Sequence, residues 1–499
     1  MVGAPALGSA LDMEVRMRCF KYSIGVWALG LLIGVVSGCG SDGSAGPATE
    51  FVADPPVTLS GPTPFGECGV VHGREAEREN SVEPWISVNP VDPENLVGAW
   101  IQGMAVGHVS SASFDGGANW EEVVIPGLSE CSGDDQYGRV SDPWLAFASN
   151  GDLYAVALPG PDFGESGPTS ILVSKSIDGG KTWGAPTTVS EAVGDDKPAI
   201  VADPVDPCLV YVGWTRFTLD DPQETLLSRT TDCGESWTDP QLLFANTPPG
   251  GGFQLLVLPD GTALAFFEVQ IEGTLYVTRS TDKGATWDEP TLITATGVQS
   301  KPVTPDGEEL IRAGHYLFDV AVDRQSGYLA AVWYDFFQGA PLISPGQVAF
   351  SSSTDGGLTW TDPVRIDRTP ANDEFALEQA FTASVEISDD GTIGVTYYDF
   401  QNATTEGPPY WSDHWFTNCH PELVDCNDPA SWGEAVRLTP ESFDYALAPY
   451  ADVTSNQGYF LGDYMGLTSA GSDFLALFSV TTEKHPADTV FVRIRGRWR

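Results

Sequence analysis

Basic residues are scarce in this sequence. The 499 residues contain 24 Lys and Arg against 69 Asp and Glu, which gives a formal net charge of −45 at pH 7. Proteins that bind nucleic acid need a basic stripe that displaces counterions from the phosphates, so nucleic acid is a poor partner for this chain. The excess of acidic residues indicates a well-hydrated, soluble surface.

Motifs for common metal, nucleotide and nucleophile chemistry are missing as well. The six His residues show no paired spacing typical of zinc sites, and no twelve-residue calcium loop is present. Gly180-Lys181-Thr182 looks like the end of a phosphate loop, but Lys175 stands where that loop requires its first Gly. The chain also lacks a Gly-x-Ser-x-Gly turn. We therefore expect no metal and no cofactor, although the many Asp residues leave calcium open.

The first fifty residues differ from the rest of the chain. Arg16, Arg18 and Lys21 precede an apolar run from Tyr22 to Val36, and Ser37-Gly38-Cys39 follows it. A short basic region, a short apolar segment and small residues before a cut site are typical of a secretory signal. A Cys at that position resembles a lipoprotein signal, with Cys39 as the lipidated residue.

This reading predicts three parts. Residues 1–38 are the signal peptide, residues 39–62 are a flexible tether rich in Gly, Ser and Pro, and residues 63–499 form one folded domain. Gly40 after the lipidated Cys resembles Gram-negative lipoproteins of the outer membrane. We expect a lipid-anchored, monomeric protein of the cell envelope, with its folded part outside the cytoplasm.

The cysteine count agrees with export. Cys19 is removed with the signal and Cys39 carries lipid, so six Cys remain. An even number in an oxidising compartment predicts three disulfides. Six Cys allow fifteen pairings, and nearness in sequence favours Cys68 with Cys131, Cys208 with Cys233, and Cys419 with Cys426.

An eight-residue pattern occurs five times. It begins with Ser or Thr, has Asp at the third position and Gly at the fifth, and ends in Trp. The five copies are Ser113–Trp120, Ser176–Trp183, Thr230–Trp237, Ser280–Trp287 and Ser353–Trp360, and the sequence near Trp432 keeps only the end of the pattern.

The pattern has a mechanical explanation. The Asp side chain accepts hydrogen bonds from nearby backbone N–H groups and closes a tight turn, and the invariant Gly indicates positive φ. The Trp offers a large apolar face for burial against the next unit. The Asp and Trp residues are therefore structural, and none of these five Asp residues is expected to be catalytic: Asp115, Trp120, Asp178, Trp183, Asp232, Trp237, Asp282, Trp287, Asp355 and Trp360.

Short apolar stretches rich in Val, Ile and aromatic residues precede each copy, with Asp-Gly, Asn-Gly or Asp-Pro turns between them. Such stretches are typical of strands in hairpins. Four-stranded units repeated every 50 to 73 residues predict an all-β protein with a β-propeller fold. We count seven blades, with six as the alternative. The last unit has no such motif, and a strand within residues 51–59 or near Val70 would complete it.

Asp boxes with this spacing resemble the sialidase superfamily of BNR-repeat proteins over roughly residues 80 to 480. The resemblance implies the propeller fold, and it implies an exo-α-sialidase activity with an Arg clamp for the substrate carboxylate, a Tyr nucleophile and acidic partners. By this resemblance the catalytic candidates are Tyr464, Asp142 and Glu83, and the substrate-binding candidates are Arg78, Arg139 and Arg312. Asp196, Asp463, Tyr137 and Tyr316 lie close by in sequence.

Two functional hypotheses follow. The first is a surface-anchored exo-glycosidase that cleaves terminal sialic acid or a related sugar from glycans. The second is a non-catalytic propeller lipoprotein that binds glycan or an extracellular protein. Glu83-Pro84-Trp85-Ile86 stands where the enzymes have a Phe/Tyr-Arg-Ile-Pro motif, which favours the second hypothesis. The Arg, Tyr and carboxyl residues ahead of the inner strands favour the first, unless they form only salt bridges and turns at the blade entrances.

Overall fold

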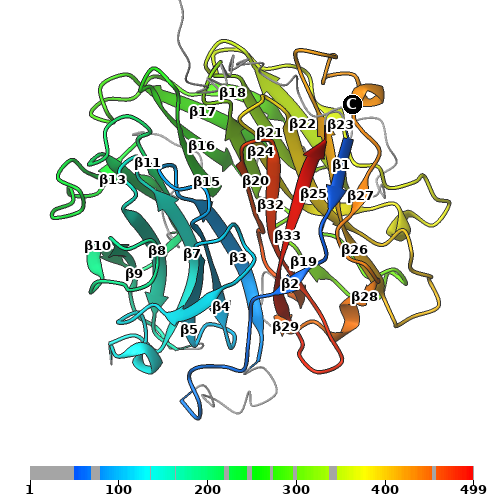
Figure 1. Cartoon of the computed structure of the whole chain (residues 1–499), viewed down its shortest axis with the longest axis horizontal. Coiled ribbons are helices and arrows are strands. Elements are labelled where there is room, and N and C mark those ends of the chain that lie inside the picture. The colour runs from blue at the N-terminus through cyan, green and yellow to red at the C-terminus, as the bar shows by residue number, and fades with distance from the viewer. Residues whose placement is uncertain are drawn as a thin grey trace, which may run out of the picture. The chain divides into compact units, whose positions relative to one another are not determined.

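A computed structural model describes most of the folded part of the chain (Figure 1). The described residues are 50–68, 79–134, 136–162, 165–217, 224–243, 250–269, 273–295, 301–336, 346–451 and 457–497. The predicted signal peptide, Cys39 and residues 40–49 of the predicted tether lie outside these ranges. None of the helices within them is both long enough and apolar enough to cross a membrane.

The described chain folds mainly into antiparallel sheets, and in each of the first six the first strand is innermost, since these first strands contact one another in chain order. The first three sheets follow one another along the chain. Their strands are β3 (Ser81–Val88), β4 (Leu96–Gln102), β5 (Gly107–Ser113) and β6 (Glu121–Val124); β7 (Arg139–Phe147), β8 (Leu153–Gly160), β9 (Thr169–Ser176) and β10 (Thr187–Ala192); β11 (Asp195–Ala202), β12 (Val210–Arg216), β13 (Glu224–Thr230) and β14 (Gln241–Leu242).

The next three sheets repeat this arrangement, and the last of them carries an additional short strand, β28. Their strands are β15 (Gly250–Val257), β16 (Ala263–Val269), β17 (Thr274–Ser280) and β18 (Thr291–Ala295); β20 (Phe318–Val322), β21 (Leu329–Asp335), β22 (Gln347–Ser353) and β23 (Val364–Arg365); β24 (Ala380–Ile387), β25 (Ile393–Asp399), β26 (Trp411–Cys419), β27 (Val436–Arg437) and β28 (Phe443–Asp444).

A seventh sheet joins the two ends of the described chain. It contains β31 (Gly466–Ala470), β32 (Asp473–Val480), β33 (Asp488–Arg497), β1 (Glu50–Ala53) and β2 (Val57–Thr58). Both N-terminal strands pair with β33, as the blue and red strands in Figure 1 show. The innermost strands β3, β7, β11, β15, β20, β24 and β31 each contact the next, and β31 contacts β3, which closes the ring. The predicted all-β propeller fold is confirmed.

The N-terminal strands correct one predicted boundary. Residues 50–58 were assigned to the tether, but β1 and β2 are hydrogen-bonded members of the seventh sheet. The start of the folded domain at residue 63 is therefore too late. The alternative that residues 51–59 complete the last unit is confirmed, because Phe51 pairs with Gly496 and Val57 with Phe491.

A small extra sheet connects two loops that are far apart in sequence. Its strands are β19 (Ile311–Arg312), β30 (Gly458–Phe460) and β29 (Tyr450–Ala451). The parallel pairing of β19 with β30 places Arg312 opposite Phe460. Four 3₁₀ helices complete the described elements: η3 (Glu130–Ser132), η4 (Phe375–Leu377), η5 (Pro429–Ser431) and η6 (Tyr445–Leu447).

The five predicted Asp boxes form the same turn. In the fifth, Ser353 Oγ donates to Asp355 Oδ1 at 2.9 Å and accepts the Gly357 N–H at 3.0 Å. Asp355 also accepts from the backbone N–H of Thr359 at 2.9 Å. Gly357 has a φ of +87°, and its counterparts in the other boxes are positive as well. These bonds all lie within one octapeptide, so the predicted structural role of the Asp residues is confirmed.

The Trp residues of the boxes pack against the preceding sheet. The Trp360 ring lies 6.1 Å from Phe266 of the fourth sheet, and Trp183 Nε1 donates to Ser110 Oγ of the first sheet at 2.9 Å. The sixth sheet lacks the box but keeps this contact, since Trp432 packs edge-on against Phe350 at 5.0 Å. Each Trp therefore helps to join two sheets that follow one another in the chain.

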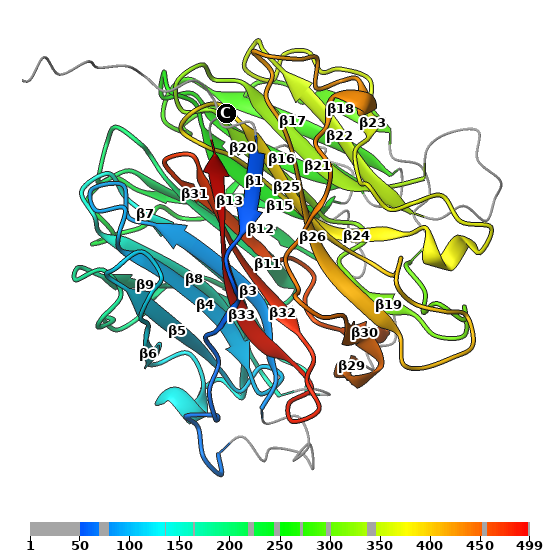
Figure 2. The same cartoon turned by 45° about the vertical axis from the view of Figure 1, so that its right-hand side comes forward.

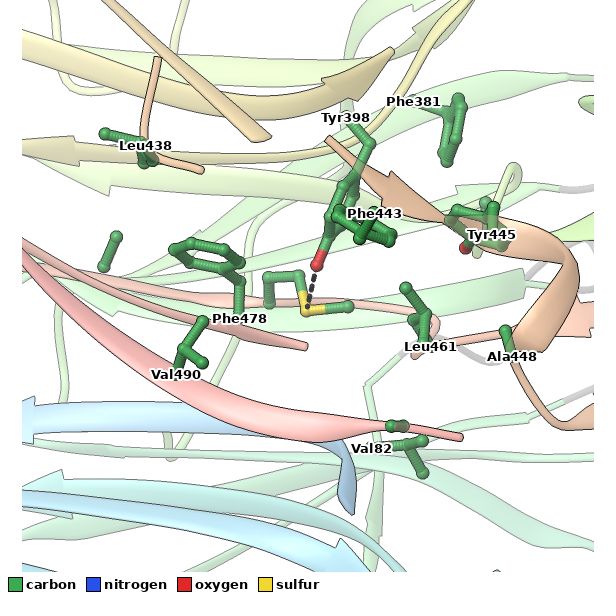
Figure 3. Close-up of a cluster of buried hydrophobic side chains, with 14 of the residues drawn as sticks. Val82, Phe381, Tyr398, Leu438, Phe443, Tyr445, Ala448, Leu461, Phe478 and Val490 are labelled. Carbon is green, nitrogen blue, oxygen red and sulfur yellow. Dashed lines mark hydrogen bonds between the residues drawn. The ribbon is translucent and has the colours of Figure 1, made fainter. Parts of the chain in front are cut away.

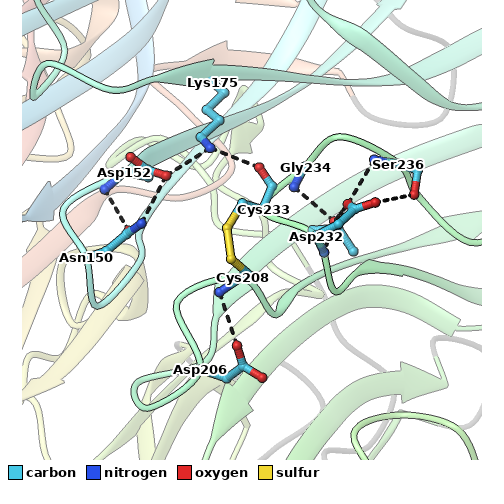
Figure 4. Close-up of a disulfide and its surroundings, with 10 residues drawn as sticks. Asn150, Asp152, Lys175, Asp206, Cys208, Asp232, Cys233, Gly234 and Ser236 are labelled. Carbon is cyan, nitrogen blue, oxygen red and sulfur yellow. Dashed lines mark hydrogen bonds and ion pairs between the residues drawn. A yellow bond between two sulfur atoms is a disulfide. The ribbon is translucent and has the colours of Figure 1, made fainter.

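The three predicted disulfides are present: Cys68–Cys131, Cys208–Cys233 and Cys419–Cys426. Figure 4 shows that the second of them links the turn before β12 to the third Asp box. There Lys175 of the second sheet donates to the Cys233 carbonyl at 2.9 Å and pairs with Asp152 at 2.8 Å. This disulfide therefore lies at a junction between sheets.

Buried aromatic side chains fill the junction between the sixth and seventh sheets. Figure 3 shows Tyr398 among Phe381, Phe443 and Phe478, with its hydroxyl 3.5 Å from Met465 Sδ. The same hydroxyl donates to the Ser479 carbonyl at 2.7 Å. This cluster holds the last two sheets together, beside the point where the two ends of the described chain close the ring.

Candidate active site

The site is built on an irregularity that recurs in the innermost strands. In β3, β7 and β11 the pairing register shifts, between Val82 and Trp85, between Ser141 and Trp144, and between Asp196 and Ala199. A β-bulge of this kind re-aims the side chain of the extra residue. In each strand the residue before a proline lies at the bulge, and these three residues are Glu83, Asp142 and Lys197.

These three residues have an uncommon backbone conformation. Their φ values are +52°, +55° and +51°, in the left-handed region that residues other than Gly rarely adopt. Such strained conformations cost about 1 to 3 kcal/mol each and concentrate at functional sites. The following prolines disfavour the right-handed helical region for these residues. Three successive strands thus use the same strained bulge to present charged side chains.

The bulge residues border a cleft of about 750 Å³. Its polar lining includes both predicted acids and two predicted arginines, and Met104, Leu158 and Phe217 contribute apolar surface. The charged and titratable lining residues are Glu83, Arg139, Asp142, Asp195, Asp196, Lys197, Lys301, Arg312, His315 and Tyr316. A cleft of this volume, with polar groups converging from several strands, is typical of a small-molecule or glycan site.

Buried ion pairs connect three strands and a loop at this cleft. Lys197 Nζ lies 2.8 Å from Asp463 Oδ2 and 3.3 Å from Asp142 Oδ1. Arg312 pairs with Asp463 in a bidentate manner, with Nε 3.2 Å from Oδ1 and Nη2 2.7 Å from Oδ2. The backbone N–H of Asp463 donates to Glu83 Oε1 at 3.1 Å. Asp463 therefore contacts both cations and orients one of the predicted catalytic acids.

Burial and neighbouring charges give two carboxyl groups of the site, Glu83 and Asp463, very different pKa values. Burial raises the pKa of Glu83 to about 8, and the negative charges of Asp142 and Asp463 add to this effect, although Lys197 opposes it. Burial would also raise the pKa of Asp463, but Arg312 and Lys197 hold it well below its usual range. Glu83 is therefore protonated near neutral pH and Asp463 is ionised. Two carboxyl groups with such different pKa values can act as proton donor and as fixed charge.

The neighbouring groups are also perturbed. Burial raises the pKa of Asp196, and the charge of Asp142 adds to this. Burial and Lys301 lower the pKa of His315 to about 4, so this imidazole is neutral near pH 7. Burial raises the pKa of the Tyr316 phenol above its usual range. The cleft thus combines neutral hydrogen-bonding groups with a small number of paired charges.

The structure brings together four of the six predicted site residues. Glu83, Asp142, Arg139 and Arg312 all line the cleft. Arg139 is the first residue of β7 and is half-buried. Arg312 lies in β19 with a side chain that is 19% exposed. Arg78 lies outside the described residues.

Tyr464, the predicted nucleophile, is half-buried and lies next to the cleft. Its ring packs edge-on against the stacked pair of Trp85 and Trp144, with centroid distances of 6.0 and 5.6 Å. Burial raises the pKa of its phenol well above the usual value, and the charges of Asp142 and Glu83 add to this. Tyr464 borders two small cavities and is not among the residues that line the cleft. Its role as the nucleophile stays a prediction.

Sequence reasoning missed Lys197 as a member of the site. The signal was nonetheless present, since Lys197-Pro198 occupies the same place in its unit as Glu83-Pro84 and Asp142-Pro143. Tyr137, which was near the candidates in sequence, instead donates to Ser170 Oγ at 3.2 Å. It is not among the residues that line the cleft.

A metal site finds no support in the described ranges. One group of three ligand-type side chains lies close together there: Cys68, Glu130 and Cys131. The two Cys residues of this group form a disulfide and have no thiolates to offer. The cleft residues pair with one another instead.

Comparison with known proteins gives partial sequence matches to xyloglucanases. No family model matches the chain. A xyloglucanase from a Paenibacillus species is 28% identical over 220 residues, which cover 41% of this chain and 20% of that protein. Xyloglucanase Xgh74A from Acetivibrio thermocellus is 27% identical over 229 residues, covering 41% of this chain and 25% of that protein. The matched segment thus spans a quarter or less of these relatives.

Similar solved structures include sialidases. The intramolecular trans-sialidase from Ruminococcus gnavus is 12% identical, with a TM-score of 0.44 and coverage of 85% of this chain and 96% of that one. The Hadza microbial sialidase Hz136 is 16% identical, with a TM-score of 0.43 and 64% of each chain covered. The α-L-arabinofuranosidase Arb93a from Fusarium graminearum is 14% identical, with a TM-score of 0.46, and 89% of this chain and 98% of that one are covered.

Proposed function

We propose that this chain is a glycoside hydrolase that acts on glycans outside the cytoplasm. One observation carries the proposal: Glu83, with a pKa of about 8, and the ion-paired carboxylate Asp142 line the same central cleft. Glycosidases commonly cleave their substrates with one protonated and one ionised carboxyl group. The relatives known as xyloglucanases support this class of reaction.

In this mechanism Glu83 is the general acid. Its proton passes to the glycosidic oxygen while the bond between that oxygen and the anomeric carbon breaks. Asp142 faces the positive charge that develops on the sugar, and it either bonds to the anomeric carbon or removes a proton from the attacking water. Water supplies the hydroxyl of the released sugar. Its other proton passes to Glu83 if Asp142 has bonded to the sugar; if Asp142 has taken that proton, Asp142 releases it to solvent and Glu83 regains one from solvent.

We propose a terminal acidic sugar, such as sialic acid, as the substrate. Arg139 and Arg312 line the cleft from different strands, and guanidinium groups bind carboxylates in a bidentate manner. Neutral glucans of the xyloglucan type are the competing substrate class. A substrate carboxylate at Arg312 would share that guanidinium with Asp463, which already accepts two of its hydrogen bonds.

The test uses the purified full chain in detergent with a fluorogenic α-sialoside and, in parallel, xyloglucan oligosaccharides. Turnover that is lost in Glu83→Gln and Asp142→Asn would support the proposed mechanism. Asp399→Asn is the matched control, because burial also raises the pKa of Asp399, to about 7, but it is not among the residues that line the cleft. If the protein is a sialidase, the substitution Arg139→Ala should also raise the KM for the sialoside. If the folded wild-type protein turns over neither substrate, the glycosidase proposal is wrong, and saturable binding of glycans would then favour a binding propeller.

We also propose that the protein is a monomer anchored to the outer membrane by lipid on Cys39. The residues from Arg16 to Gly40 support this, and they lie outside the described ranges. Metabolic labelling with a fatty-acid precursor should mark the wild-type chain and not Cys39→Ser. Labelling of the variant, or recovery of the wild type from the soluble fraction, would contradict the anchor.

A further inference from the structure

Lys197 is the third member of a set that the fold repeats. Glu83, Asp142 and Lys197 occupy corresponding bulges of β3, β7 and β11, each before a proline and each with φ near +50°. Two of these positions carry the carboxyl groups of the proposed reaction. The third position carries the ammonium group of Lys197. The strained backbone at this residue indicates that the position of its side chain matters to the site.

The contacts of Lys197 are short and buried. Its side chain is 9% exposed, and it reaches Asp142, which is 5% exposed, and Asp463, which is fully buried. Its ammonium also lies 5.9 Å from the centre of the Tyr464 ring. A lysine buried to this extent is retained only where counter-ions compensate its desolvation.

The buried charges around Lys197 sum to zero when Glu83 is protonated. Arg312 already neutralises Asp463 through two hydrogen bonds. The charge of Lys197 is therefore the one that compensates Asp142. With Glu83 protonated, this cluster of five side chains has two anions and two cations, whereas an ionised Glu83 would add an uncompensated buried charge.

We propose that Lys197 is a positioning residue of this site, which holds the Asp142 carboxylate in place through their buried ion pair. The catalytic meaning of this role rests on the proposed glycosidase function, but the charge arrangement does not. Lys197 need not touch the substrate, since it acts through the Asp142 carboxylate.

The groups that face Lys197 come from every element around it. They comprise acids, bases and phenols of four strands and two loops. They are Glu83 of β3, Asp142 of β7, Asp196 of its own strand β11, Arg312 of β19, Tyr316 before β20, and Asp463 and Tyr464 before β31.

The direction of the pKa shifts agrees with this arrangement. Burial lowers the pKa of Lys197, but Asp142 and Asp463 raise it well above its usual value, so the ammonium stays charged. The positive charge of Lys197 in turn opposes the burial that raises the pKa of Glu83. Removal of Lys197 should therefore make Glu83 hold its proton to a higher pH.

Infrared difference spectroscopy of protonated carboxyl groups tests the proposal without a substrate. Spectra of the full chain are recorded from about pH 5 to about pH 9. Subtraction of Glu83→Gln isolates this carboxyl from the other buried acids with raised pKa values, such as Asp319 and Asp399. In the wild type, Glu83 should lose its proton near pH 8.

In Lys197→Met, the Glu83 signal should persist to a pH higher by about one unit or more. Lys197→Arg keeps the charge and should retain the wild-type pattern. An unchanged titration in folded Lys197→Met would overturn the proposal. If that variant does not fold, the wild type alone decides, since loss of the Glu83 proton well below pH 8 would also overturn it.

Activity provides a separate readout once a substrate is found. Lys197→Met should lower kcat by about 100-fold, with little change in KM, and should move the alkaline limb of the pH profile upward, because the general acid Glu83 keeps its proton to a higher pH. Lys197→Arg should recover part of the loss. Absence of turnover by the wild type would contradict the proposed function only, because the infrared titration measures the same charges independently.

Discussion

Arg312 holds the carboxylate of Asp463 with two hydrogen bonds, of 3.2 and 2.7 Å, although 151 residues separate them in the chain. The parallel pairing of β19 with β30 makes this contact possible, since it brings Arg312 opposite Phe460, three residues before Asp463. The same carboxylate accepts from Lys197 at 2.8 Å. One buried anion therefore fixes the position of two cations at the cleft.

Loss of Arg312 should destabilise the fold. Arg312→Ala leaves Asp463 buried with Lys197 as its remaining ion-pair partner, and the loss of one partner of a buried pair costs about 3 to 5 kcal/mol. The matched control is Arg495→Ala, which breaks an exposed bidentate pair with Asp54 and should cost about 1 kcal/mol or less. Urea denaturation measures both. Equal changes in the free energy of unfolding would contradict the buried pair.

Glu83 should make the protein less stable as the pH rises from about 4.5 to about 8, and less active as the pH passes about 8. The pKa of Glu83 rises from its ordinary value of 4.5 to about 8 on folding, because of burial. Between these values the folded state holds a proton that the unfolded state releases, so the contribution of Glu83 to stability decreases as the pH rises. Glu83→Gln should flatten this part of the stability profile.

The activity of the wild type should decline as the pH passes about 8, because the general acid loses its proton. Melting temperatures and initial rates over this range check both expectations. Asp399→Asn provides the contrast: it should change the stability profile, since its pKa is raised to about 7, and leave the activity profile unchanged. Identical profiles for Glu83→Gln and wild type would contradict the assignment.

The first residue of an Asp box should matter for stability but not for activity. Ser353→Ala removes the acceptor of the buried Gly357 N–H and the donor to Asp355, and an unsatisfied buried group costs about 1 to 3 kcal/mol. Thr354→Ala in the same turn is exposed and should change stability by about 0.5 kcal/mol or less. Chemical denaturation of both variants gives the comparison, and a catalytic defect in folded Ser353→Ala would show that the box has a further role.

Two of the three disulfides close loops of very different length and should contribute unequally to the free energy of unfolding. Cys68–Cys131 closes a separation of 63 residues and Cys419–Cys426 one of 7. The chain-entropy model then predicts about 4 kcal/mol for the first and about 2.5 kcal/mol for the second. Paired Cys→Ser variants, compared by denaturation, test the order. A larger loss for the Cys419–Cys426 pair would show that native contacts outweigh loop closure.

The sequence also predicted several members of the site. Glu83, Asp142, Arg139 and Arg312 were identified from their positions ahead of inner strands, and all four line the cleft. Lys197 was missed because its neighbours in sequence do not disclose its partners: Asp142 and Asp463 lie 55 and 266 residues away. Tyr464 was expected at the cleft, and its half-buried ring packs beside it against the stacked Trp85 and Trp144.

The sequence by itself determined whatever is local. The Asp boxes form as predicted because their hydrogen bonds lie within eight residues, and the hairpins follow from alternating apolar stretches and turn residues. Disulfides between Cys residues that are near in sequence were predictable for the same reason. Only the tertiary structure decided that residues 51–59, and not the region near Val70, complete the last sheet, that Arg312 reaches Asp463, and that Glu83 keeps its proton. Those features depend on burial and on charges from distant strands, which no stretch of sequence contains.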